Sequence, residues 1–323
     1  MIDFDQAVTA LLRSEKSRCL RMEPMSRHTT FRIGGPARVF ACPGDERDLA
    51  ALVCFCREQE IPWAVLGNGS NLLVSDSGYE GVVISMEENW NVCEAEGTRL
   101  RAGAGLLLPK ASRAALDASL AGLEFACGIP GTVGGALVMN AGAYGREMKD
   151  VVRRVRVMTM EGQVMTLEAD ALELGYRTSV IPKKGYIVLE AELELVPGSR
   201  ERIRREMEEL SAKRRDKQPL EYPSAGSTFK RPAGYFAGKL IDDAGLRGFT
   251  VGGAQVSEKH CGFVINRENA TAADVLSLCD QVRKRVKEAF GVELELEVKR
   301  LGNFEGPGGG MDRDGEPKEQ ETE

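Results

Sequence analysis

A glycine-rich stretch constrains this chain more than any other feature. Residues 128–145 read GIPGTVGGALVMNAGAYG, and six of these eighteen residues are glycine. Glycine destabilises a regular helix or strand because it loses the most backbone freedom on folding. The stretch therefore predicts either unusual backbone angles or the close approach of another group to the backbone. A second glycine loop, GNGSN at 67–71, follows a predicted strand at 63–66.

Composition limits the class of protein. The chain has 323 residues, of which 42% are hydrophobic and 28% charged, so we expect a globular protein with more than one domain. A net charge of −6 argues against nucleic acid as the main partner. The chain has no apolar run of about eighteen residues and no secretion signal at its start, which together predict a cytoplasmic protein without membrane insertion.

The eight cysteines show no metal-ligand spacing, and Cys54 and Cys56 fall within one predicted helix. A cytoplasmic location keeps thiols reduced. We therefore expect free thiols and no metal site.

The first part of the chain alternates predicted strands and helices. Residues 1–26 predict an N-terminal helix, with a strand to follow at 38–43. Asp45 is placed to cap the next helix, which leads to the strand at 63–66. This order is typical of a small α/β unit.

Two later segments complete the first body. Residues 151–169 predict a hairpin that turns at Glu161-Gly162, and residues 187–196 alternate like a strand. A charged helix at 198–219 is stopped by a proline and marks a natural domain boundary.

The second body contains one strongly predicted helix, at 271–290. Thr271 and Asp274 have the spacing of a capping box, and Gly291 is the expected stop. The boundaries of this helix therefore rest on local side-chain chemistry.

Both glycine loops could bind an anion. Consecutive amides in tight turns form an anion-binding concavity, and Asn68, Ser70, Asn71 and Asn140 add side-chain donors. Neither loop has the pattern of a P-loop or of a Rossmann dinucleotide site, so both of those classes are unsupported. The alternative is that the loops are tight turns packed against a sheet.

Three further residues have an ordinary explanation when taken singly. Ser227 is most simply a turn serine, and Arg177 a surface arginine. Glu297 lies in GVELELEV, a predicted strand whose three glutamates share one face. Spacing alone does not choose Glu297 over the other two.

Several segments, taken together and in order, resemble the UDP-N-acetylenolpyruvoylglucosamine reductases, which are bacterial flavoenzymes of peptidoglycan precursor synthesis. The resemblance extends over residues 27–302 and is specific because many motifs occur in one order. The segments are GNGSNLLVSD (67–76), GIPGTVGGALVMNAGAYG (128–145), YRTS (176–179), YPSAGSTFKRP (222–232), AGKLIDDAGLRG (237–248) and LELEV (294–298).

The resemblance implies an α+β fold. It comprises a two-lobed, non-Rossmann FAD-binding domain of the vanillyl-alcohol-oxidase type and a C-terminal α+β substrate-binding domain. The implied boundaries are an N-terminal helix at 1–26, the FAD-binding domain at 27–197 with lobes at about 27–86 and 87–197, a linking helix at 198–219, the substrate-binding domain at 220–302 and a disordered acidic tail at 303–323.

The resemblance also implies the reaction. Hydride passes from NADPH to N5 of FAD and then to the β-carbon of UDP-N-acetylglucosamine enolpyruvate, giving UDP-N-acetylmuramate. The first glycine loop contains no histidine that could attach the flavin, so we expect non-covalent FAD. We expect no obligate protein partner.

Negative charge that develops at the α-carbon needs fixed positive or hydrogen-bonding groups, and the carbon needs a proton. By the resemblance, Ser227 donates the proton, while Arg177 and Glu297 hold the enolpyruvyl carboxylate. Glu297 is then expected to be neutral, because an ionised carboxylate would repel an enolate.

The remaining contacts follow from the same resemblance. The pyrophosphate should meet the amides of 67–71, and 128–142 should pass along the rest of the flavin. Lys230, Tyr235 and Lys239 are the candidates for binding substrate. The candidates for binding the cofactor are Gly67, Asn68, Gly69, Ser70, Asn71, Ile129, Pro130, Gly131, Gly134, Gly135, Asn140, Ala141, Gly142, Arg214 and Lys299.

The chain departs from the family pattern in one residue and resembles one of its subgroups. Lys299 stands where most members have arginine, and the short sequence separation between Arg177 and Ser227 resembles the subgroup without the tyrosine-bearing loop.

Two alternative functions remain at this point. One is another FAD oxidase or electron-transfer flavoprotein of the same fold, and the other is a non-enzymatic nucleotide-binding protein.

Overall fold

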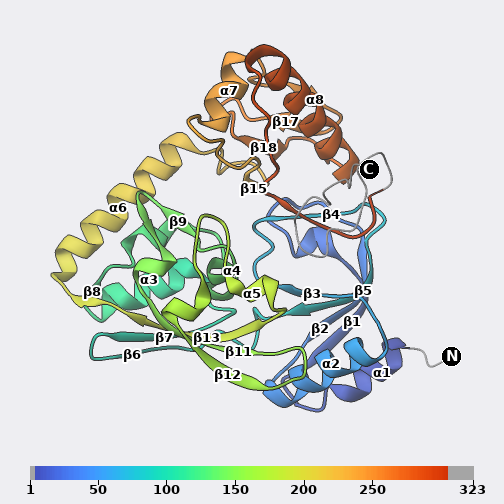
Figure 1. The fold of residues 1–323 in the computed structure, drawn as a ribbon, viewed down its shortest axis with the longest axis vertical. Coiled ribbons are helices and arrows are strands. Elements are labelled where there is room, and N and C mark those ends of the chain that lie inside the picture. The colour runs from blue at the N-terminus through green and yellow to red at the C-terminus, as the bar shows by residue number, and fades with distance from the viewer. Residues whose placement is uncertain (1–3, 305–323) are drawn as a thin grey trace, which may run out of the picture. The chain divides into compact units, whose positions relative to one another are not determined.

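The computed structural model describes residues 4–304, and the chain divides into two compact units (Figure 1). Among the described residues, the first comprises 4–23, 37–68 and 81–217, and the second comprises 24–36, 69–80 and 218–304. Two segments from the range predicted for the FAD-binding domain therefore pack with the C-terminal part. For 69–80 the physical reason is backbone pairing, because β4 (Leu72–Val74) forms a parallel pair with β19 (Lys299–Leu301). For 24–36 it is hydrogen bonding, from Thr30 Oγ1 to Ser224 O (2.7 Å) and from Asn266 Nδ2 to Phe31 O (3.2 Å).

The first unit begins with a four-stranded sheet in the order β1-β2-β5-β3. The predicted helix cap is confirmed, since the Asp45 side chain accepts hydrogen bonds from the amides of Arg47 and Asp48. Buried side chains of α2 and of these strands share one core. The elements are α1 (Phe4–Leu11), β1 (Arg18–Pro24), β2 (Pro36–Cys42), α2 (Glu46–Glu58), β3 (Trp63–Leu66) and β5 (Tyr79–Ser85).

The prediction of a single helix over 1–26 is wrong beyond Leu11, because β1 forms the edge of this sheet. The Asp48 carboxylate accepts hydrogen bonds from Ser14 N (2.9 Å) and Ser17 Oγ (2.6 Å). These bonds hold a turn between the helix and β1, so contacts distant in sequence determine the local conformation.

The second sheet of this unit has the order β12-β11-β13-β7-β6 and is antiparallel throughout. The predicted hairpin at 151–169 is confirmed by the pairing of β11 with β12. Helix α6 (Arg200–Lys217) confirms the predicted charged helix and packs against α3 and η2. The other elements are β6 (Cys93–Glu96), β7 (Arg99–Gly103), α3 (Leu108–Asp117), β8 (Leu120–Ala121), η2 (Glu124–Gly128), α4 (Val133–Val138), β9 (Gly142–Ala143), β10 (Arg146–Glu147), η3 (Met148–Asp150), β11 (Val152–Met158), β12 (Val164–Glu168), η4 (Ala169–Leu172), α5 (Val180–Lys183), β13 (Ile187–Glu194) and β14 (Val196–Pro197).

The second unit contains the antiparallel sheet β15-β18-β17-β16 and two helices. The predicted capping box of α8 is confirmed, and Gly291 ends this helix with a left-handed backbone (φ 69°). The elements, besides β4 and β19, are η1 (Met25–Arg27), β15 (Ser224–Ser227), α7 (Ala237–Asp243), β16 (Thr250–Val251), β17 (Ala254–Val256), β18 (Phe263–Asn266) and α8 (Ala272–Phe290).

The predicted strand at 291–298 is wrong. This segment forms a single isolated bridge, between Leu296 and Phe229, and no regular strand precedes β19. The alternation also fails, because Glu297 is buried beside the buried Val298. The predicted disordered tail at 303–323 lies almost entirely outside the described residues. No described helix is long and apolar enough to cross a membrane.

Candidate functional site

In the first unit, protein atoms fill the space beside two glycines of the glycine loops. A Cβ on Gly67 would lie 2.3 Å from Thr132 Oγ1, and a Cβ on Gly134 would lie 3.1 Å from Ala104 O. Thr132 also caps α4 by accepting a hydrogen bond from the Gly135 amide (3.4 Å). At Gly67 and Gly134 the missing side chain is therefore explained by packing within the protein.

Two other features of this unit leave room for a ligand. Gly135 is exposed, and a Cβ there would meet only Thr132 Oγ1, at 3.5 Å. The half-buried Arg214 side chain makes no hydrogen bond or ion pair with any described residue. Burial lowers the pKa of its guanidinium. Because a desolvated cation needs a counter-charge, these residues fit a bound dinucleotide such as FAD, whose phosphates carry negative charge.

The asparagine side chains of the glycine loops are hydrogen-bonded within the protein. Each donates its side-chain amide to a backbone carbonyl of another segment. The half-buried Ser70 hydroxyl, by contrast, has no hydrogen-bond partner among the described residues. Direct contact of the asparagine side chains with a cofactor stays a prediction. The three bonds are Asn68 to Pro130, Asn140 to Gly175 (3.1 Å) and Asn71 to Glu297 (3.2 Å).

Arg177 lies in a tight turn before α5 and has a left-handed backbone (φ 56°). The turn is held on both sides by the glycine-rich stretch. Asn140 Nδ2 donates to Gly175 O (3.1 Å), and Ser179 Oγ donates to Val138 O (2.8 Å). The fold therefore fixes the position of Arg177 relative to 128–145.

The remaining cofactor candidates of residues 128–142 lie in the segments around α4. Ile129, Pro130 and Gly131 connect η2 to α4, Ala141 comes after α4, and Gly142 begins β9. The structure thus brings the candidates from 128–142 into one unit, together with Arg177 and Arg214.

In the second unit, Ser227 ends β15 after an irregularity in the strand. The pairs Ser224–Ile265 and Ser227–Phe263 are separated by a register shift, and Gly226 between them has φ 76°. The Ser227 side chain is exposed, and within residues 4–304 its hydroxyl makes no hydrogen bond. The bulge therefore leaves this hydroxyl available to a substrate.

Burial distinguishes Glu297 from the other glutamates of its segment. Glu297 is only 8% exposed, whereas Glu293 and Glu295 are exposed and form ion pairs with Lys287 and Lys230. Sequence spacing could not separate these three residues, because the difference depends on what packs over the segment.

Backbone pairing brings Glu297 beside the segment of Ser227. The Glu297 amide donates to Thr228 O (2.9 Å), and the buried Thr228 Oγ1 accepts a hydrogen bond from Val264 N (2.9 Å). Thr228 is a supporting residue that the sequence analysis missed. Thr228 follows the end of β15, and a threonine there carries no local signal for such a role.

The substrate candidates lie on the surface of the same unit. Lys230 Nζ lies 2.9 Å from Glu295 Oε2, and Lys239 pairs with Asp243. Tyr235 is 48% exposed. The cofactor candidate Lys299 is also exposed, at the start of β19. Both Lys230 and Lys239 would have to exchange a carboxylate partner for a ligand.

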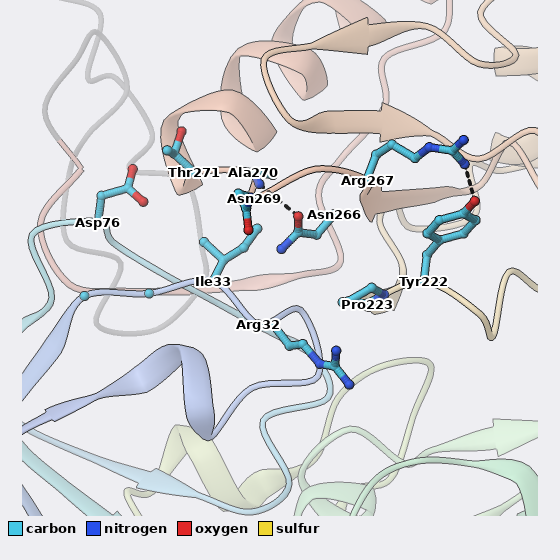
Figure 2. Close-up of a pocket in the computed structure, with 12 residues that line it drawn as sticks. Arg32, Ile33, Asp76, Tyr222, Pro223, Asn266, Arg267, Asn269, Ala270 and Thr271 are labelled. Carbon is cyan, nitrogen blue, oxygen red and sulfur yellow. Dashed lines mark hydrogen bonds between the residues drawn. The ribbon is translucent and has the colours of Figure 1, made fainter.

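Figure 2 shows a hollow in the second unit that none of the candidate site residues lines. Its volume is about 500 Å³. Several of the polar groups that line this hollow are hydrogen-bonded to other protein groups. Arg267 bonds to the Tyr222 hydroxyl, and Asp76 accepts hydrogen bonds from Ala272 N (2.8 Å) and Ala273 N (3.0 Å). We assign it no ligand.

All eight cysteines are free thiols, and burial raises the pKa of Cys56 and Cys279 to about 12. Among the residues described, no group of three or more His, Cys, Asp or Glu side chains is placed to hold a metal ion.

Two family models match the chain in order. Residues 37–168 match "FAD binding domain", and residues 218–301 match "UDP-N-acetylenolpyruvoylglucosamine reductase, C-terminal domain". The fold and the residues that fit a dinucleotide thus define an FAD-dependent oxidoreductase, as the resemblance implied.

Individual relatives give the family. The chain is 52% identical to UDP-N-acetylenolpyruvoylglucosamine reductase of Lachnoclostridium phytofermentans, over 94% of this chain and 98% of the relative. It is 54% identical to that of Caldanaerobacter subterraneus, over 87% and 92%. The crystal structure of the Thermus caldophilus reductase matches with a TM-score of 0.76 and 38% identity, covering 88% of this chain and 98% of that one. The chain belongs to the UDP-N-acetylenolpyruvoylglucosamine reductase family.

Proposed function

We propose that this protein reduces UDP-N-acetylglucosamine enolpyruvate to UDP-N-acetylmuramate, with NADPH as reductant, in the cytoplasm. The structural observation that best supports this is the backbone bond between Glu297 and Thr228 (2.9 Å), which places a buried carboxyl on the segment next to Ser227. An exposed hydroxyl and a buried carboxyl on neighbouring, hydrogen-bonded segments suit a reaction that must bind a carboxylate and protonate the carbon next to it.

Bound FAD, held without a covalent bond, would supply a two-electron carrier between NADPH and the enolpyruvyl group. In the first unit, Gly135 and Arg214 would contact it, because Gly135 is exposed and Arg214 has no hydrogen-bond or ion-pair partner among the described residues. Arg177 and Glu297 hold the substrate carboxylate. Ser227 Oγ donates a proton to the α-carbon.

The test separates the two halves of the reaction. Stopped-flow absorbance at the flavin band follows reduction by NADPH and then reoxidation by the enolpyruvyl substrate. We expect Ser227→Ala to leave the first half unchanged and to slow the second by about 10²–10⁴-fold, the usual contribution of a general acid. Ser224→Ala, on the same strand, is the matched control and should slow neither half.

Other outcomes point elsewhere. Equal slowing of both halves by Ser227→Ala would make Ser227 a structural residue. Reoxidation of the wild type by oxygen but not by the enolpyruvyl substrate would favour an oxidase. Protein that binds nucleotide but never flavin would contradict the proposal as a whole.

A further inference from the structure

Asn71 joins the first glycine loop to the segment that carries Glu297. Its side-chain Nδ2 donates to Glu297 O (3.2 Å), and its backbone carbonyl accepts a hydrogen bond from Lys299 N (3.0 Å). Directly after Asn71 the chain enters β4, which pairs with β19 from Lys299 onward. The asparagine therefore stands at the point where the glycine loop becomes part of this two-stranded sheet.

Glu297 is held from its other side by Thr228. The Glu297 amide donates to Thr228 O (2.9 Å), and Thr228 in turn donates its amide to Gly262 O (2.9 Å). Thus the amide of Glu297 is anchored to the segment of Ser227, while its carbonyl is anchored to Asn71.

These bonds matter because the segment is not part of a regular strand, although Lys230 N donates to Glu295 O (2.9 Å) and Arg283 Nε donates to Leu294 O (3.0 Å). Residues 292–298 form no regular strand and make one isolated bridge, from Leu296 to Phe229. A backbone without a strand ladder depends on individual hydrogen bonds to fix its position. The donor from Asn71 binds the carbonyl of Glu297 itself, so it bears directly on where the Glu297 side chain begins.

We propose that Asn71 is a positioning residue for Glu297. By this inference, which rests on the proposed function, its side-chain amide couples the flavin-binding loop to the catalytic carboxyl. Occupation of the loop at 67–71 by FAD then orders Glu297 for the second half of the reaction. The alternative is that the Asn71 side chain binds the cofactor phosphates directly.

Asn71→Asp tests the coupling with little change of shape. Aspartate keeps the backbone acceptor for Lys299 but loses the donor to Glu297 O. The new carboxylate lies in the loop expected to meet the pyrophosphate, so both halves are measured at saturating FAD. There we expect reduction by NADPH to change little and reoxidation by the enolpyruvyl substrate to slow by up to about 100-fold, as the misplacement of a reacting group can cost. If Asn71→Asp does not fold, Asn71→Leu removes the same donor without adding a charge.

Asn68→Asp is the matched comparison, because Asn68 also donates its amide to a backbone carbonyl from the same loop, that of Pro130. Among the described residues Asn68 makes no hydrogen bond to residues 292–298, so Asn68→Asp should slow the two halves in equal proportion if it acts at all. A selective loss of the second half in Asn68→Asp as well would overturn the special role of Asn71.

Hydrogen exchange provides a readout that needs no turnover. We expect addition of FAD to the apoprotein to slow exchange of the Glu297 and Lys299 amides in the wild type but not in Asn71→Asp. Unchanged exchange in the wild type, or an equal FAD effect in both proteins, would overturn the coupling. Weakened FAD binding with a normal second half would make Asn71 a cofactor ligand.

The two proposals can fail separately. Exchange measured with FAD alone does not involve the enolpyruvyl substrate, so loss of the FAD effect leaves the proposed function standing. Conversely, an intact FAD effect in a protein that never reduces this substrate would contradict the proposed function alone.

Discussion

The Arg214 side chain lies directly against the backbone of Gly128, such that a Cβ built on Gly128 would come within 2.9 Å of Arg214 Cδ. The Arg214 side chain is half-buried, its burial lowers the pKa of the guanidinium, and no described residue offers it a carboxylate. Burying a charge without a partner costs free energy. The arrangement therefore favours an anionic ligand at this position.

Replacing Arg214 by methionine should weaken FAD binding. A hydrogen bond to a charged group contributes about 1.5–3 kcal/mol, so we expect the dissociation constant to rise by about 10–150-fold. Titration of FAD into apoprotein, followed by flavin fluorescence, measures it. Arg205→Met, at an exposed position on the same helix, is the control and should bind FAD normally. If Arg214→Met binds FAD normally but has a raised KM for the enolpyruvyl substrate, Arg214 binds the substrate rather than FAD.

Gly69 and Gly135 should respond in opposite ways to alanine. At Gly69 the backbone is left-handed (φ 57°) and a Cβ would lie 2.1 Å from His28 O, so Gly69→Ala should lose more than about 2 kcal/mol of apoprotein stability. At Gly135, within α4, a Cβ meets nothing closer than 3.5 Å. Gly135→Ala should therefore stabilise the apoprotein by up to about 1 kcal/mol.

The two variants separate packing from cofactor contact. Urea unfolding of the apoprotein gives the stability change, and FAD titration gives the affinity. If FAD passes along the glycine-rich stretch, Gly135→Ala should lose affinity while gaining stability. Unchanged FAD affinity in a stabilised Gly135→Ala would show that FAD does not approach this residue.

These glycines also show what could be predicted from the sequence. Their density indicated a close approach to the backbone, and that expectation is met at Gly67 and Gly69. The sequence could not tell whether protein or cofactor makes the approach. At both residues it is protein, from Thr132 and His28, and such contacts depend on how distant segments pack.

Elements with a local chemical signal could be predicted well. The cap at Asp45 and the capping box of Thr271 and Asp274 involve neighbours in sequence, and both are found. The segment of Glu297 could not be predicted, because its alternation fits a strand while its burial depends on distant segments. The family motifs, rather than periodicity, selected Glu297.

The capping box of α8 gives a prediction of pH-dependent stability. Hydrogen bonds from the Thr271 amide and hydroxyl, and from Gly253 N, hold the pKa of Asp274 below its ordinary value despite partial burial. A lowered pKa in the folded state stabilises the protein above the unfolded-state pKa, and this contribution is lost as the pH falls through the folded-state pKa. Asp274→Asn should therefore cost about 1 kcal/mol at neutral pH.

The difference between Asp274→Asn and the wild type should shrink as the pH falls below the ordinary range of aspartate. Urea unfolding at a series of pH values measures it, with Asp280→Asn as the exposed control on the same helix. A stability loss that stays constant with pH would mean that the size of the side chain, rather than its charge, supports the helix.

The last prediction compares two glutamates of one segment. Glu297 is 8% exposed, whereas Glu293 is exposed and paired with Lys287. Glu293→Ala should change stability by less than about 0.5 kcal/mol, as is usual for a surface ion pair, and should leave both halves of the reaction unchanged.

Glu297→Ala should bind FAD and accept electrons from NADPH normally. Its reoxidation by the enolpyruvyl substrate should slow by about 100-fold or more, because the substitution removes a group that stabilises developing charge. Stopped-flow absorbance of the two halves, with unfolding curves for both variants, decides the matter. Similar rates in Glu293→Ala and Glu297→Ala would show that burial of Glu297 serves only the packing of this segment.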